Sequence, residues 1–310
     1  MVSELMIAGG LFIVSLVLLV SSATYLVGSL ANVTKKIGLS GFIVGSLVLA
    51  MGNSLPEFTT ALISTLQASA DLGLGTLIGS PITNLCLIIG IVALISPIKL
   101  SKKHKVERMA FLFMLIPPIM VLLTGSDNHI SRLEGAIYLA IFAGYQYYLY
   151  SQGVTLGRSV KFKQLMLHYA MIPLAVFSLI ISGFLLVDTG DFIAKALAIP
   201  PAIIGLVIIS IGTSLPDLSA GIIAALKKEA EMGVGDVSGA NIFDVLFGIG
   251  AIALFHPFDF TFSYFKIPLL VSLGATAITV AYVFLRNSID RVLGGILLAS
   301  YVIYVLLVIL

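Results

Sequence analysis

The chain has 310 residues, of which 59% are hydrophobic and only 10% are charged. Because a soluble domain carries roughly 25% charged residues, this composition excludes a soluble globular protein and predicts an all-α polytopic membrane protein. The net charge of +2 gives no indication of a nucleic-acid partner, and the single cysteine, Cys86, excludes an internal disulfide and a CxxC metal site. We expect Cys86 to be a small buried packing residue.

Charged residues divide the chain into ten apolar segments. In chain order these are residues 5–34, 37–70, 72–98, 109–126, 135–157, 164–187, 196–226, 237–258, 267–285 and 292–310. Each is close to or above the ~18–20 residues that a helix needs to cross a bilayer. With the N-terminus outside, fourteen of the seventeen Lys and Arg residues fall on the cytoplasmic side, in agreement with the positive-inside rule. We therefore expect ten transmembrane helices in the cell membrane, with both termini extracellular.

Two stretches of the chain repeat each other. Residues 39–98 align with residues 199–258 at a constant offset of 160, and 18 of the 60 positions are identical. Five apolar segments precede residues 151–163 and five follow them, so the second half enters the membrane from the opposite face. The sequence thus predicts a first five-helix repeat over 1–150, a cytoplasmic linker over 151–163 and an inverted five-helix repeat over 164–310.

The second and seventh segments each contain a proline followed directly by an acid. The motifs read GNSLPE at residues 52–57 and GTSLPD at residues 212–217. Proline cannot donate the helical backbone hydrogen bond, so we expect both helices to be broken there, with free carbonyls around Ala50 and Ser210. No Lys or Arg lies at membrane depth to pair with Glu57 or Asp217, and buried acids of this kind mark cation sites.

The third and eighth segments carry a second pair of motifs, at residues 73–84 and 233–244. Ser80 and Asn84 are four residues apart and share a helix face, as do Ala240 and Asp244. Their glycines would let these helices approach the broken ones closely. Asp236 lies two turns before Asp244, either as an attractant for cations in a vestibule or as an acid at a helix start.

These motifs together predict one site lined only by oxygen ligands. Its members are Glu57, Asp217, Asp244, Asn84, Asn53, Thr213, Ser54, Ser214 and Ser80. Oxygen ligands favour hard ions such as Ca²⁺ and Na⁺ over zinc or copper. Three crowded carboxylates need cations or protons to neutralise them. Any lone hydroxyl, however, is as apt to bond a carbonyl of its own helix as to bind an ion.

The paired motifs, GNSLPE with GSPITN and GTSLPD with GANIFD, resemble the two repeats of the cation/calcium exchanger superfamily. The resemblance is closest to the sodium/calcium exchangers, including the potassium-dependent branch. It implies an antiporter that exchanges Na⁺ for Ca²⁺ by alternating access. It implies neither an enzyme nor an organic cofactor, and no partner beyond inorganic cations and the lipid bilayer. K⁺ dependence stays open.

The resemblance also implies roles for particular residues. Glu57 and Asp217 would bind Ca²⁺, with Asn53 and Thr213 beside them. Asp244 matches the acid of the second motif, and Asn84 is its first-repeat mate. The sodium ligands would be the hydroxyls and carbonyls at Ser54, Ser214, Ser80, Ala50 and Ser210.

Three departures and three alternatives accompany this interpretation. Asn53 stands where sodium exchangers usually have threonine, which is a feature of proton/calcium antiporters, the principal alternative. Ala240 lacks a hydroxyl, and Asp236 replaces a neutral residue. Residues 233–236 also read GxGD, as in intramembrane aspartyl proteases, but the chain contains no Tyr-Asp pair to supply the second catalytic acid. A cation channel would not require inverted broken helices around an acidic pair.

Overall fold

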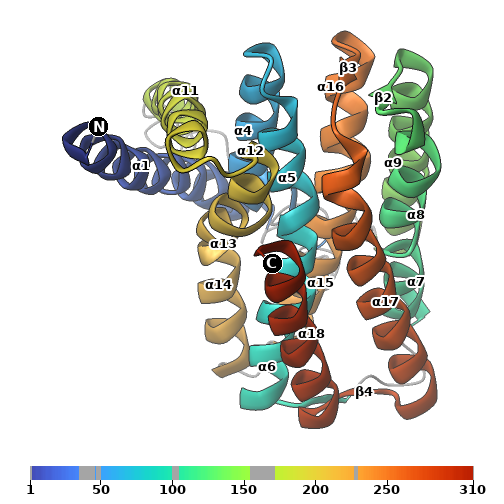
Figure 1. Cartoon of the computed structure of the whole chain (residues 1–310). Coiled ribbons are helices and arrows are strands. Elements are labelled where there is room, and N and C mark those ends of the chain that lie inside the picture. The colour runs from blue at the N-terminus through green and yellow to red at the C-terminus, as the bar shows by residue number, and fades with distance from the viewer. Residues whose placement is uncertain are drawn as a thin grey trace.

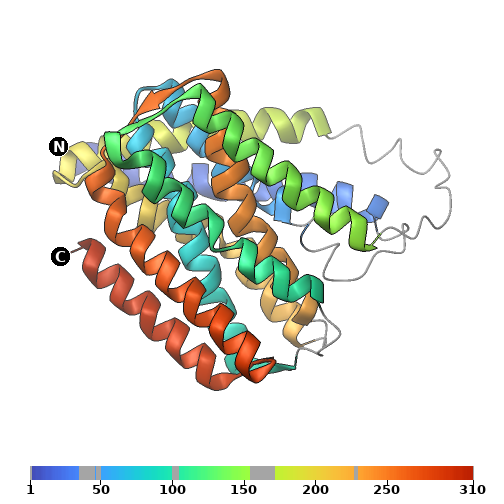
Figure 2. The same cartoon turned by 90° about the vertical axis from the view of Figure 1, so that its right-hand side faces the viewer.

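The computed structural model describes residues 2–34, 46, 50–99, 105–153, 172–226 and 230–309. Its helices form an elongated bundle, shown in Figures 1 and 2. Within the described residues, eight helical stretches are long and apolar enough to cross a membrane. They are Ser3–Tyr25, Ala70–Ile95, Arg108–Asp127, Pro173–Leu197, Pro201–Ile223, Gly233–Phe255, Phe262–Arg286 and Arg291–Ile309. The expected segments 37–70 and 135–157 are not among these eight, so the count of ten stays a prediction.

The first half of the chain runs from α1 to α9. Its helices are α1 (Val2–Thr34), α3 (Ala50–Asn53), α4 (Leu55–Leu66), α5 (Ala70–Ile82), the π-helix η2 (Thr83–Ile89), α6 (Gly90–Ile95), α7 (Lys105–Phe113), α8 (Ile116–Thr124), the 3-10 helix η3 (Gly125–Asp127) and α9 (Arg132–Gly153). Two short strands, β1 (Ile98–Lys99) and β2 (His129–Ile130), complete this half. Most of the predicted linker 151–163 lies outside the described residues.

The second half runs from α11 to α18 and repeats part of this order. Its helices are α11 (Ile172–Leu197), α12 (Pro201–Ile203), the π-helix η5 (Ile204–Ile209), α13 (Ser210–Thr213), α14 (Leu215–Leu226), α15 (Ala230–Ile242), the π-helix η6 (Phe243–Ile249), α16 (Gly250–Phe255), α17 (Phe262–Arg286) and α18 (Arg291–Ile309). Its strands are β3 (Phe258–Asp259) and β4 (Ser288–Ile289). The elements from α3 to β1 recur from α13 to β3 with every boundary shifted by 160 residues.

The short strands connect the two halves at opposite ends of the bundle. β1 pairs antiparallel with β4, and β2 pairs antiparallel with β3. β2 and β3 lie at the top in Figure 1, whereas β4 lies at the bottom. The corresponding strands β1 and β3 therefore end at opposite ends of the molecule.

Helices of each half pack closely on the broken segment of the other half. α5 contacts η5, and α15 contacts α3. Glycines make this approach feasible: a Cβ added at Gly239 would lie 2.5 Å from the Ser46 carbonyl oxygen, and one at Gly75 would lie 2.5 Å from that of Ala202. The sequence-based expectation that glycines bring the third and eighth segments against the broken helices is therefore correct.

α1 and α11 pack against each other at the side of the bundle (Figure 1). Leu19 of α1 and Leu186 of α11 are fully buried in a hydrophobic cluster separate from the main core, and this cluster also includes residues of α4, α5 and η5. Their outer faces carry exposed apolar side chains such as Met6 and Phe177. These exposed faces suit a lipid environment, whereas Cys86 is fully buried in the main core, as expected.

One expected segment departs from a single helix. Residues 109–126 were expected to span the membrane without interruption, but α7 ends at Phe113 and α8 begins at Ile116. Pro117 and Pro118 explain the break, because proline lacks an amide donor and disfavours helical geometry in the residue before it. The same stretch still counts as one apolar crossing.

Candidate cation site

Two matching helix breaks form the centre of the candidate site. Ser54 separates α3 from α4 with φ −79° and ψ 3°, and Ser214 separates α13 from α14 with φ −82° and ψ 0°. Both residues thus adopt the sparsely allowed region near ψ 0°. Pro56 and Pro216 follow two residues later in the sequence. The predicted breaks in both helices are therefore present, with the same backbone geometry.

The carbonyls near these breaks are less free than expected. The Ser54 amide donates to the Ala50 carbonyl at 3.1 Å, and the Ser214 amide donates to the Ser210 carbonyl at 3.2 Å. The Ser210 hydroxyl donates to the Leu206 carbonyl and the Thr213 hydroxyl to the Ile209 carbonyl. Each carbonyl oxygen keeps a second lone pair for a cation, but these two hydroxyls serve their own helix.

Ser80, on α5, contacts residues at both helix breaks. Its hydroxyl donates to Glu57 Oε1 at 3.4 Å and lies 3.2 Å from the Ser214 hydroxyl. Asn84 Nδ2 donates in turn to Ser80 Oγ at 3.4 Å. Glu57, Ser80 and Asn84 are at most 1% exposed. These distances are long for hydrogen bonds, so the cluster is polar and close but not tightly bonded.

Asn84 and Asp244 occupy equivalent positions on π-helices, the second residues of η2 and η6. No local sequence pattern indicated these π-helices, which are frequent at functional sites. Asp244 lies beside Ser54 and Ser80 and is 1% exposed. Neither of its carboxylate oxygens has a regular hydrogen-bond partner within the described part of the chain. The two carboxylate oxygens of Asp244 are therefore available to a cation.

The central acids interact across the two halves. Glu57 lies next to Thr213, and Asp217 lies next to Asn53. Glu57 also interacts electrostatically with Asp244 and Asp217. Oε2 of Glu57 and Oδ1 of Asp217 are both buried and find no hydrogen-bond partner in the described ranges. The structure thus brings the predicted acids into one polar interior, each with an oxygen to offer.

Two further side chains belong to this interior. Asp236 is only 3% exposed and accepts a 3.0 Å hydrogen bond from Asn53 Nδ2, so it is neither an exposed helix-start acid nor a residue of an open vestibule. Its spacing of eight residues from Asp244 was the sequence signal. Asn241, which sequence reasoning did not select, donates from Nδ2 to the carbonyl of its repeat mate Pro81 at 3.1 Å.

The acids share this interior without forming a three-residue metal group. Among the described residues, no three His, Cys, Asp or Glu side chains form a group that could hold a metal ion. A single cation here would take at most two carboxylates and complete its coordination with hydroxyl, amide and carbonyl oxygens. Such mixed oxygen shells suit Ca²⁺, which accepts 6–8 ligands.

A second polar region lies at the β2–β3 end of the bundle. A cavity of about 510 Å³ there is lined by four aspartates and one lysine, namely Asp71, Asp127, Asp191, Asp259 and Lys195. Lys195 pairs with Asp191 at 2.5 Å. This end of the molecule therefore has an acidic opening.

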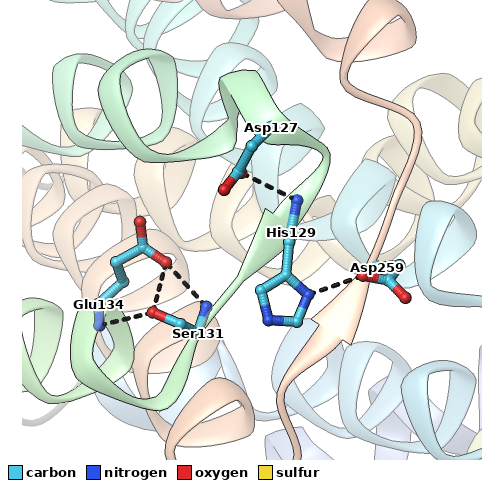
Figure 3. Close-up of polar contacts among 5 residues, drawn as sticks. All are labelled: Asp127, His129, Ser131, Glu134 and Asp259. Atoms are coloured by element: carbon cyan, nitrogen blue, oxygen red, sulfur yellow. Dashed lines mark hydrogen bonds and ion pairs between the residues drawn. The ribbon is translucent and has the colours of Figure 1, made fainter.

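Local hydrogen bonds fix the loop beside this opening (Figure 3). The His129 ring lies 2.7 Å from Asp259 across the β2–β3 pair, and the His129 amide donates to Asp127. Ser131 and Glu134 exchange backbone and side-chain hydrogen bonds at the start of α9, which is a capping box.

Known proteins resemble the whole of this arrangement. The profile of the sodium/calcium exchanger protein family matches residues 7–151 and 167–310. The putative antiporter CaxA of Alkalimonas amylolytica is 32% identical over 77% of the chain and 79% of that protein. The sodium/calcium exchanger MaX1 of Methanosarcina acetivorans is 24% identical over 94% of the chain and 95% of its own length.

Solved structures of the sodium-calcium exchanger NCX_Mj have the same fold. One of them, soaked with 2.5 mM Na⁺ and 1 mM Sr²⁺, superposes with a TM-score of 0.72 at 26% identity. The match covers 96% of this chain and 97% of that chain. The matched relatives are exchangers and antiporters, in agreement with the expectation that the chain is not an enzyme.

Proposed function

The chain belongs to the sodium/calcium exchanger protein family, and on that basis we propose that it is a secondary antiporter that exchanges Na⁺ for Ca²⁺ by alternating access. Family membership makes it an integral membrane protein and a cation/calcium antiporter. The coupling ion, the topology and the residues that bind the ions are the parts that we propose.

The proposed topology has ten transmembrane helices in two inverted five-helix repeats, over 1–150 and 164–310. The placement of β1 and β3 at opposite ends of the bundle supports the inversion, because equivalent elements of inverted repeats face opposite sides. The distribution of Lys and Arg puts the β1–β4 end in the cytoplasm. The acidic opening at the β2–β3 end would then face outside, as would both termini.

The observation that carries the proposal is the pair Glu57 and Asp217. Each acid follows the proline of its own broken helix, each is buried, and each has a carboxylate oxygen without a partner among the residues described. Two carboxylates neutralise one Ca²⁺. We assign Glu57 and Asp217 to the calcium site, with Asn53 and Thr213 as neutral neighbours.

Sodium would occupy overlapping positions around the same acids. Ser54, Ser80 and Ser214 supply neutral oxygens next to Glu57 and Asp244. The Ala50 and Ser210 carbonyls can add a second acceptor lone pair, and Asp244 and Asn84 complete the cluster. Because the ions share carboxylates, binding of Na⁺ would displace Ca²⁺, which couples the two fluxes.

Alternating access would follow from the packing of α1 and α11. The two helices share with α4, α5 and η5 a hydrophobic cluster that lies apart from the main core, and we infer that they shift along this apolar contact while the site stays in place. Inverted repeats permit two near-equivalent arrangements that open the site to opposite sides. K⁺ dependence is not part of the proposal.

Proton/calcium antiport is the second candidate, because Asn53 replaces the usual threonine and contacts Asp236. The deciding experiment is ⁴⁵Ca²⁺ uptake into proteoliposomes that contain the purified chain, with the membrane potential clamped. We expect uptake driven by an outward Na⁺ gradient at equal pH on both sides, and none when choline replaces Na⁺. Undiminished uptake in choline, driven by a pH step, would instead establish proton coupling. Glu57→Gln serves as the inactive control.

A further inference from the structure

Asp236 is an acid that the proposed calcium and sodium positions do not use. It lies on α15, eight residues before Asp244 of η6, and eight residues correspond to about 12 Å along a helix axis. Its side chain is 3% exposed. A buried acid at membrane depth is costly and is retained for function by default, so its neighbours decide what it does.

Asp236 shares its surroundings with Asn53 and Asp217. Asn53 Nδ2 donates to Asp236 Oδ2 at 3.0 Å, and Asn53 also lies beside Asp217. Asp217 and Asp236 interact electrostatically. The second oxygen of Asp236 and one oxygen of Asp217 are both buried without a hydrogen-bond partner in the described chain. Within the part of the chain that the structure describes, no lysine or arginine is among the groups that act on either acid.

The equivalent place in the other repeat is chemically different. Thr76 is the repeat mate of Asp236, and its hydroxyl donates to the Leu72 carbonyl of its own helix at 3.2 Å. Thr213 is the repeat mate of Asn53 and likewise bonds to its own helix, at the Ile209 carbonyl. The equivalent place thus holds a single acid, Glu57, which lies next to Thr213, whereas the place formed by Asp236, Asn53 and Asp217 holds two acids, each with a buried oxygen that finds no partner in the described chain.

We propose that Asp236, Asn53 and Asp217 form a second position for a hard cation, displaced from Glu57 towards the N-terminal end of α15. Two carboxylate oxygens would be its protein ligands, and rotation of the Asn53 amide, whose Nδ2 faces Asp236 in the structure, would add the side-chain oxygen Oδ1. This is an oxygen set suited to Na⁺ or Ca²⁺. This inference rests on the proposed function in one respect, namely that Na⁺ and Ca²⁺ are the ions that reach the position.

Asp217 would serve both positions. In the Glu57 position it pairs with the first-repeat acid, and in the second position it pairs with Asp236. One aspartate cannot give its full charge to two divalent ions at once, so Ca²⁺ would occupy one position at a time. The second position would therefore be an intermediate binding position for an ion that moves between the central site and the β1–β4 end of the bundle.

The test is equilibrium dialysis of the purified full-length chain against ⁴⁵Ca²⁺ and, separately, ²²Na⁺. Glu57→Gln should retain saturable but weaker cation binding through Asp217 and Asp236. The double variant Glu57→Gln, Asp236→Asn should lose that residual binding. Glu57→Gln, Asp236→Glu should keep it, because a carboxylate remains. Combining Glu57→Gln with Thr76→Val, which alters the matched position in the other repeat, should leave the residual binding unchanged.

Equal binding of both isotopes by Glu57→Gln and by its Asp236→Asn double variant would overturn the proposal. Gel filtration and circular dichroism check that each variant is folded, and the Asp236→Glu variant keeps the comparison valid if Asp236→Asn does not fold. The ²²Na⁺ and ⁴⁵Ca²⁺ arms distinguish a monovalent from a divalent occupant. Dialysis does not depend on transport, so a failure of sodium-driven uptake and a failure of this proposal would be seen separately.

Discussion

The two copies of the repeat place different chemistry on the same backbone. The first copy contributes one acid to the interior, Glu57, with neutral polar side chains at the matching positions, namely Asn53, Thr76, Ser80 and Asn84. The second copy contributes three acids, Asp217, Asp236 and Asp244, and has no hydroxyl at Ala240. The two copies therefore share the same helix break in the backbone, but their side chains differ, and most of the negative charge lies on the second copy.

This asymmetry explains the hydrogen bonds across the site. Asn53 and Ser80 of the first copy donate to Asp236 of the second copy and to Glu57, respectively. Hydroxyls of the second copy, such as those of Thr213 and Ser210, donate mainly to carbonyls of their own helix. The first copy thus supplies donors that organise the acids, and the second copy supplies most of the charge.

The largest expected effect comes from removing one central acid. Glu57→Gln and Asp217→Asn should each reduce calcium uptake by a factor on the order of 100 or more, because loss of a buried charge partner costs about 3–5 kcal/mol. Proteoliposome uptake of ⁴⁵Ca²⁺ measures both. Asp217→Glu, which makes the two copies alike, should retain uptake. Wild-type uptake by Asp217→Asn would show that only the first copy binds calcium.

A smaller effect is expected from substitutions at Ser80 and at its repeat mate, Ala240. Ser80→Ala removes a hydroxyl that contacts Glu57, Ser214 and Asn84. We expect it to raise the Na⁺ concentration for half-maximal exchange by about two- to tenfold, since such a contact contributes roughly 0.5–1.5 kcal/mol. Ala240→Ser should shift it in the opposite direction. The sodium dependence of uptake at fixed pH measures both shifts, and equal responses would mean that the copies are equivalent here.

The smallest effects concern the caps of α9 and α18, which begin the last helix of each half. Ser131 caps α9 with Glu134, whereas Asp290 caps α18 by accepting from the amides of Val292 and Leu293. Ser131→Ala and Asp290→Ala should each lower the free energy of unfolding by about 1 kcal/mol. Thermal unfolding in detergent measures both. No change in either variant would show that packing alone holds these helix starts.

The stabilisation by the Asp290 cap should depend on pH. Burial opposes the charged form, but hydrogen bonds from Tyr282, Leu293, Ser288 and Val292 outweigh it and lower the pKa of Asp290. Because the folded pKa lies below the unfolded value of about 3.9, the stabilisation is present above that pH and is lost as pH falls through the folded pKa. The difference in the free energy of unfolding between wild type and Asp290→Ala should therefore shrink in acid, which thermal unfolding at a series of pH values measures.

The helix breaks were accessible from the sequence because their cause is local. Pro56 and Pro216 lack an amide donor, and this property acts on the preceding turn in any surroundings. The break between α7 and α8 has the same cause, in Pro117 and Pro118, but a hydropathy-based segment from 109 to 126 passes over it. Hydropathy measures how apolar a segment is, and it carries no information on whether the helix backbone is continuous.

The sequence by itself determined the membrane class, the duplication, the two helix breaks at proline and the choice of Glu57 and Asp217 as candidate ligands. These depend on composition, spacing and local backbone chemistry. Only the tertiary structure decided that Asp236 is buried beside the candidate site, since its partner Asn53 is 183 residues away in the other repeat. The π-helical positions of Asn84 and Asp244 were equally hidden, because they arise from how these helices pack. Contacts between the halves depend on the way that the repeats fit together, and no local pattern encodes that fit.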